Sequence, residues 1–175
     1  LDTVSHEAVH LVLARASSDE APVWLQEGVA KFLERRWRED TPGAHLDPAS
    51  ELLLHQALTC PARAQAPECQ RALASGTAAL LPFERLHPSI ARLDSQEQAA
   101  LAFAQVATFV EGFYRAHGRA GLQRAIRLTA SGADAREALA AVAGVPFERL
   151  VERWREGPRA RPAPDARAPP PILRL

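Results

Sequence analysis

The sequence predicts a mostly α-helical fold, and three observations support this expectation. Apolar residues recur at intervals of three and four along several segments, as the buried face of an α-helix requires. Proline, glycine and capping residues separate these segments, and no segment reads convincingly as a strand. The chain has 175 residues, of which 47% are hydrophobic, so it is long enough to bury one compact core.

In the first half of the chain, clusters of turn-forming residues separate three expected helices. These helices cover residues 2–16, 22–39 and 47–58. The segment between Cys60 and Cys69 is rich in proline and alanine and is expected to form a loop. A disulfide between the two cysteines would close this loop and favour an extracytoplasmic location, while two free thiols are the alternative.

The second half contains the strongest helical pattern, which starts at Ser95. Ser95 and Gln98 have the spacing of a capping box, and Gly118 is a natural helix end. Between them, one helix face collects the apolar residues Ala99, Ala102, Phe103, Val106, Phe109, Val110 and Phe113. Shorter helices, bounded by prolines or glycines, are expected over residues 83–86, 120–129, 134–143 and 146–156.

Composition divides the chain into a domain and a tail. Residues 1–157 are expected to form one domain, whereas residues 158–175 are rich in proline, arginine and alanine. Such a composition cannot bury enough apolar surface to fold, so the tail is expected to be disordered or a linker. The chain contains no methionine, even at position 1, so an N-terminally truncated domain is expected.

Charge and hydropathy exclude two classes of partner. The chain has 21 basic and 21 acidic side chains and a formal net charge of zero. Proteins that bind nucleic acid usually carry a basic excess, so nucleic acid is not an expected partner. No run approaches the roughly 20 apolar residues that a membrane-spanning helix needs, so no membrane segment is expected in this chain.

Residues 6–10 read His-Glu-Ala-Val-His, which is the pattern HExxH. Positions i and i+4 of a helix share one face with Cβ atoms roughly 5–6 Å apart, so His6 and His10 can bind one zinc ion at about 2.0–2.1 Å each. Glu7 stays outside the ligand set and near a metal-bound water, whose proton it can accept. The alternative is an amphipathic helix with solvated histidines. Neighbouring apolar residues instead favour a buried helix whose histidines need partners: Val4, Ala8, Leu11 and Val12.

A zinc peptidase also needs a third protein ligand and an open position for water. The extended pattern HExxHxxGxxH is excluded, because Leu13 and Ala16 occupy its glycine and histidine positions. The segment Trp-Leu-Gln-Glu-Gly-Val-Ala at residues 24–30 offers the carboxylate of Glu27 on the following helix. Gly28 is small, so this helix could approach the first one closely. A solvated carboxylate is the alternative for Glu27.

The pattern HExxH followed by WLxEGxA resembles the peptidase MA-like gluzincin family. This resemblance implies a zinc metallopeptidase that acts on a peptide or protein substrate. It implies that His6, His10 and Glu27 bind the zinc ion and that Glu7 is the general base. It also implies that the chain is the ligand-bearing and C-terminal helical portion of a zincin-like (α+β) metallopeptidase domain, with the upstream sheet largely absent.

Outside these two motifs, the chain shows weaker matches to the family and two departures from it. The matches cover residues 81–86, 102–105 and 144–150 together with Trp154. Phe103 stands where the family often has a tyrosine that could donate to the oxyanion, and the upstream cleft wall is missing. These departures favour the alternative function, a catalytically weak or inactive pseudopeptidase that serves as a zinc-binding or protein-interaction module. A ligand histidine usually donates its second N–H to a carboxylate or a carbonyl, and Glu34, two turns beyond Glu27 on the same helix face, or a backbone carbonyl could accept it. The favoured expectation is instead a solvated Glu34 that pairs with Arg38.

Overall fold

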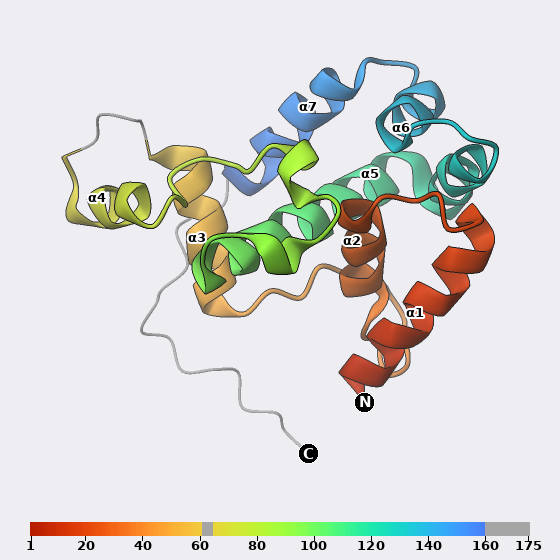
Figure 1. The fold of residues 1–175 in the computed structure, drawn as a ribbon, viewed down its shortest axis with the longest axis horizontal. Helices are drawn as coiled ribbons and strands as arrows, with labels where there is room; N and C mark the ends of the chain where they lie inside the picture. Colours follow the sequence, from red (N-terminus) through yellow and green to blue (C-terminus); the bar gives the residue numbers. More distant parts are fainter. Residues whose placement is uncertain (61–64, 160–175) are drawn as a thin grey trace.

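The computed structural model describes residues 1–60 and 65–159, and within these ranges it contains helices and no β-strand (Figure 1). The mostly α-helical prediction is therefore confirmed. The α-helices are α1 (Asp2–Ser17), α2 (Val23–Leu33), α3 (Pro48–Thr59), α4 (Pro67–Ala74), α5 (Gln96–Ala130), α6 (Ala135–Ala143) and α7 (Phe147–Arg159). Two short 3-10 helices lie between α4 and α5, η1 (Phe83–Leu86) and η2 (Ile90–Arg92). Among the described helices, none combines the length and the apolarity needed to cross a bilayer.

Helix α5 is the central element, and it contacts α1, α2, α3, α6 and α7 (Figure 1). Its predicted apolar face is buried: Ala102, Val106, Phe109, Val110 and Phe113 are all inaccessible to solvent or nearly so. The backbone N–H of Gln98 donates to Ser95 Oγ at 3.1 Å, as the capping pattern predicts. Gly118 has φ 67° and ψ −177°, so it interrupts the helix where the sequence places an end, and glycine tolerates this left-handed φ.

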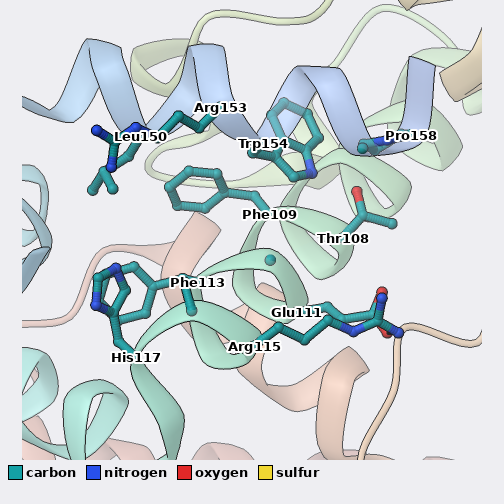
Figure 2. A pocket seen from close by; sticks show the side chains of 13 residues that line it. Thr108, Phe109, Glu111, Phe113, Arg115, His117, Leu150, Arg153, Trp154 and Pro158 are labelled. Atoms are coloured by element: carbon teal, nitrogen blue, oxygen red, sulfur yellow. The ribbon is translucent and has the colours of Figure 1, made fainter. Parts of the chain in front are cut away.

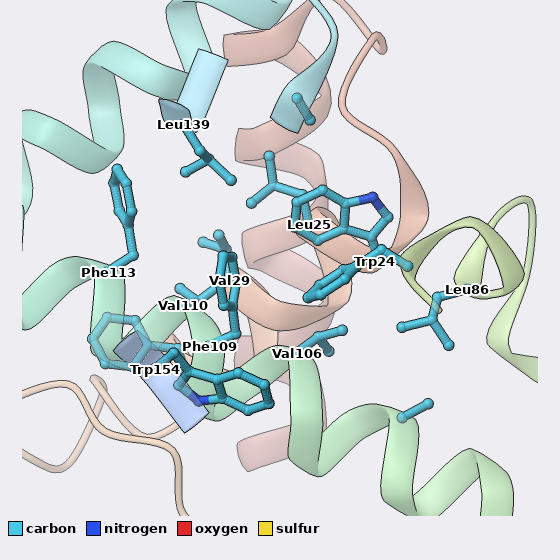
Figure 3. Close-up of a cluster of buried hydrophobic side chains, with 14 of the residues drawn as sticks. Trp24, Leu25, Val29, Leu86, Val106, Phe109, Val110, Phe113, Leu139 and Trp154 are labelled. Atoms are coloured by element: carbon cyan, nitrogen blue, oxygen red, sulfur yellow. The ribbon is translucent and has the colours of Figure 1, made fainter. Parts of the chain in front are cut away.

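An aromatic cluster holds α2 against α5 and α7 (Figure 3). The Trp24 ring lies 4.9 Å from the Phe83 ring, and Phe109 lies 5.2 Å from Phe83 and 5.8 Å from Trp154, centroid to centroid. These pairs are edge-on, the arrangement that the charge distribution of aromatic rings favours. Helix α2, which carries Glu27, is therefore fixed by packing on the side that faces the core.

The buried amide of Gln105 joins α5 to the segment that precedes η1. Its Oε1 accepts from the Leu81 backbone N–H at 2.9 Å, and its Nε2 donates to the Leu81 carbonyl at 2.8 Å. Both backbone groups are thus satisfied in a place where water cannot reach them. Two of the segments with softer family matches, residues 81–86 and 102–105, therefore contact each other.

Several element boundaries differ from the sequence-based expectation. Helix α2 ends at Leu33 rather than near Glu39, because residues 34–38 form turns whose exposed Trp37 and Arg38 side chains bind Asp2. Helix α7 continues to Arg159, two residues beyond the expected end of the domain at residue 157. A proline in the last turn removes a single backbone donor, which is compatible with this ending. The remainder of the expected tail, residues 160–175, lies outside the described residues.

The segment between the cysteines contains a helix that the sequence interpretation missed. Cys60 and Cys69 form a disulfide, and Cys69 lies in α4 rather than in a loop. Pro67 occupies a first-turn position of α4, where its missing N–H costs no helical hydrogen bond. The prolines that suggested a loop thus include one that starts a helix. The disulfide is the state that favours an oxidising compartment, and the extracytoplasmic location stays a prediction.

Helix α1 lies at the edge of the fold, and much of its apolar surface is exposed. Leu11 is 71% exposed, and Val4, Ala8 and Val12 are exposed as well. The expectation of a buried helix was therefore wrong for this face. Only Leu13 and Ser17 are fully buried, because α1 contacts α2 and α5 along a single side.

Gly28 serves a different contact from the expected one. A Cβ atom at this position would lie 2.8 Å from the Val106 carbonyl oxygen and 2.8 Å from Val110 Cγ2, both on α5. The absence of a side chain therefore lets α2 approach α5 rather than α1. This close approach also affects the position of Glu27, because Glu27 lies on α2 beside Gly28 and moves with that helix.

Replacing Gly28 by alanine is expected to destabilise the protein. Overpacking costs about 1–3 kcal/mol, which outweighs the gain of about 1 kcal/mol in helix propensity. Gly157→Ala is the matched control, because it too lies in a helix and a Cβ atom there would meet no atom of the described residues within 4 Å, beyond its neighbours and its own helix backbone. Urea unfolding of both variants measures the difference. A Gly28→Ala protein as stable as Gly157→Ala would contradict the packing at this contact.

Candidate metal centre

Helices α1 and α2 carry the candidate ligands, and a tight connection turns the chain between them. Ser18 and Asp19 have φ values of 53° and 62°, in the left-handed region that aspartate tolerates better than most residues. The Ser18 N–H donates to the Ala14 carbonyl and so closes the end of α1. Pro22 then precedes the first turn of α2 in an extended conformation.

The opposite ends of α1 and α2 are joined by Asp2. Its Oδ1 accepts from Trp37 Nε1 at 2.8 Å, and its Oδ2 accepts from an Arg38 Nη atom at 2.7 Å. The hydrogen bond from Trp37 is the largest cause that lowers the pKa of Asp2. Since the connection joins one end of the pair and Asp2 joins the other, the segment with the candidate ligands is held from both sides.

The side chains of His6, His10 and Glu27 converge on one point. His6 Nε2 lies 3.1 Å from Glu27 Oε2 and 3.1 Å from His10 Nε2, and His10 Nε2 lies 3.5 Å from Glu27 Oε2. A tetrahedral ion with bonds of about 2.0–2.1 Å spaces its ligand atoms about 3.3 Å apart. The spacing of these three atoms therefore fits a tetrahedral zinc ion, and two imidazoles with one carboxylate are a ligand set typical of catalytic zinc.

The site is open on one side. The side chains of His6, His10 and Glu27 are 17%, 22% and 21% exposed, so each is anchored by the protein yet reachable from solvent. Glu7 follows His6 on α1 and is exposed. Water can therefore reach the ligand atoms, as a catalytic zinc site requires.

The negative charges around His6 change its proton affinity. The hydrogen bond with Glu27 is the largest cause that raises the pKa of His6 above its ordinary value of 6.5. Burial opposes this effect, and the charges of Glu27, Glu34 and Glu7 add to it. In the metal-free protein these carboxylates therefore favour the protonated form of the His6 imidazole.

Stability of the metal-free protein is expected to depend on the protonation of His6. Because its pKa is raised in the folded state, its contribution is fully present below pH 6.5 and is lost as the pH rises through the raised pKa. Urea unfolding of wild type and His6→Gln, both freed of metal, measures this contribution from about pH 5 to pH 9. The difference between the two proteins should shrink as the pH rises. A difference that is constant across this range would contradict the pairing of His6 with the carboxylates.

Glu34 is the residue that the sequence interpretation placed wrongly. Its side chain is 9% exposed rather than solvated, and its partners are Lys31 Nζ at 2.8 Å and His6 Nδ1 at 3.7 Å. The expected partner, Arg38, binds Asp2 instead, because the chain leaves the helix at Leu33. The available signal was the spacing from Glu27, since seven residues are close to two helical turns.

Two pockets lie away from the candidate ligands. A pocket of about 640 Å³ between α5 and α7 is lined by Phe109, Trp154 and His117, and His117 packs on Phe113 at 4.6 Å (Figure 2). A second pocket, of about 650 Å³, lies between α1, α2 and α5 and includes Tyr114. His6, His10 and Glu27 line neither of these two pockets.

No family model, no curated protein and no solved structure matches this chain. The resemblance to gluzincins therefore depends on residues 6–10 and 24–30. What the fold adds is the proximity of these two motifs, which lie on neighbouring helices with their donor atoms in contact distance.

Proposed function

We propose that this chain is a zinc-dependent metallopeptidase domain of the gluzincin type that hydrolyses peptide bonds. The observation that carries the proposal is the convergence of His6, His10 and Glu27, whose ligand atoms all lie within 4.8 Å of one another. These residues come from two sequence motifs separated by a turn, and their spacing suits a tetrahedral ion. Exposed acidic clusters are common, but two imidazoles from HExxH facing one carboxylate form a more selective set.

Each residue has a distinct role in the proposed reaction. A zinc ion would polarise the scissile carbonyl and lower the pKa of water to about 7. His6, His10 and Glu27 would hold it with one net negative charge, which leaves the centre positive. The Glu7 carboxylate accepts a proton from the attacking water and delivers it to the leaving amine. Its exposure is compatible with this role, because substrate must enter from the solvent side.

A second candidate function is a zinc-binding interaction module without hydrolytic activity. The exposed apolar residues of α1 favour it, because large apolar side chains such as Leu11 and Val12 on a surface often mark a contact with another protein. In this alternative the same three residues bind zinc, but the ion has a structural role. The two functions differ in turnover rather than in metal binding.

Peptide hydrolysis by the zinc-loaded wild type tests the proposal directly. A library of fluorogenic peptides is incubated with the protein before chelation, after chelation and after zinc is restored. We expect cleavage that the chelator stops and zinc restores. Stoichiometric zinc without cleavage of any peptide would favour the interaction module. No stoichiometric zinc would rule out both functions.

A further inference from the structure

We propose that Glu34 is a positioning residue that orients His6 for metal binding, an inference that depends on the proposed zinc site. Glu34 Oε2 lies 3.7 Å from His6 Nδ1, the other nitrogen of the ring. Nε2 is the atom that faces Glu27 and His10. The imidazole therefore lies between two carboxylates, one at the metal centre and one behind it.

The placement of Glu34 indicates a built contact rather than a surface charge. Its side chain is 9% exposed, and burying an unpaired carboxylate in this way is unfavourable. Lys31 compensates the charge, because its Nζ donates to Glu34 Oε1 at 2.8 Å. With Oε1 held by Lys31, Oε2 is left to face His6. Lys31 thus fixes the carboxylate, and the carboxylate faces the ring.

Glu34 can determine which nitrogen of His6 is free for a metal. A carboxylate beside Nδ1 favours a proton on that atom, so Nε2 keeps its lone pair toward the centre. Shortening the Nδ1–Oε2 distance by about 0.7 Å would give an ordinary hydrogen bond. Such a contact also limits rotation of the ring. Within residues 1–60 and 65–159, no carboxylate lies within 4 Å of His10 Nδ1, so the effect is specific to one ligand.

Zinc affinity and the imidazole nitrogen signals of Glu34→Gln test this inference. Competition with a chromophoric chelator gives the dissociation constant, and ¹H–¹⁵N NMR of the zinc-loaded protein reports on each imidazole nitrogen. We expect the dissociation constant to rise about 10–100-fold, as is typical when a partner of a ligand histidine is lost. The Nδ1 signal of His6 should shift and its proton should exchange faster, while His10 is unchanged. Glu34→Asp should recover part of the affinity.

The control is Glu111→Gln, which also removes a buried helical carboxylate paired with a cation, Arg115 at 2.8 Å. Its zinc affinity should equal that of wild type. If Glu34→Gln does not fold, Lys31→Met alters a more exposed side chain and should weaken zinc binding in the same direction. Wild-type affinity and an unchanged His6 signal in Glu34→Gln would overturn the positioning role alone. A wild type that binds no zinc would overturn the proposed function as well.

Discussion

Glu7→Gln is expected to abolish most peptide hydrolysis while leaving zinc bound. Glutamine keeps the size of the side chain but cannot accept the proton of the attacking water. A general base contributes typically 10²–10⁴-fold to the rate, so kcat should fall by about that factor. Since Glu7 is exposed and lies outside the ligand set, its replacement should change neither the fold nor the zinc content.

The measurement compares kcat and zinc content for wild type, Glu7→Gln and Glu156→Gln. Glu156 is an exposed glutamate on α7 and controls for the loss of one negative charge on a helix surface. We expect full activity in Glu156→Gln. Equal kcat in all three proteins would exclude Glu7 as the general base. A Glu7→Gln protein without zinc would instead place Glu7 among the groups that hold the ion.

Glu27→Gln is expected to weaken zinc binding by more than 100-fold. Loss of a group that only supports a ligand costs about 10–100-fold in metal affinity, and loss of a charged ligand should cost more. The amide keeps a hydrogen-bonding partner for His6 Nε2, which lies 3.1 Å from the carboxylate, so the helices should stay together. His6 and His10 would remain as a weak two-residue site.

Competition with a chromophoric chelator measures this loss, and circular dichroism reports on the fold. Glu111→Gln again serves as the control, because Glu111 is another mostly buried helical glutamate. A Glu27→Gln protein that binds zinc as tightly as wild type would mean that a different group supplies the third ligand. The proposed gluzincin-type zinc site would then be wrong, because a glutamate as third ligand defines that type.

Most of the helices could be predicted from local sequence patterns. The capping contact of Ser95, the interruption at Gly118 and the start of α3 directly after Asp47 all appear where the sequence places them. Each is a short-range feature, since a capping side chain acts within about one turn of its own residue. Helix α4 was missed because proline both breaks and starts helices, and composition alone does not distinguish the two cases.

The candidate site was predictable in part. His6 and His10 lie one helical turn apart, so their shared face follows from the helix itself. The exposed apolar face of α1 and the contact of Gly28 with α5 could not be predicted from the sequence. Apolar and small residues indicate that a helix can pack closely, but they do not indicate which helix it packs against. Glu34 was misplaced for a related reason. Its partner by helical spacing was Arg38, but the helix ends before that residue.

The sequence by itself determined the mostly helical fold and the pairing of His6 with His10, because both depend on residues within a few positions of each other. Only the tertiary structure decided that Glu27 faces this pair and that Glu34 lies behind His6. These contacts span more than twenty residues and depend on how α2 is seated against α5 and joined to α1 by Asp2. Packing fixes the rotation of one helix against another, and no local pattern encodes that rotation.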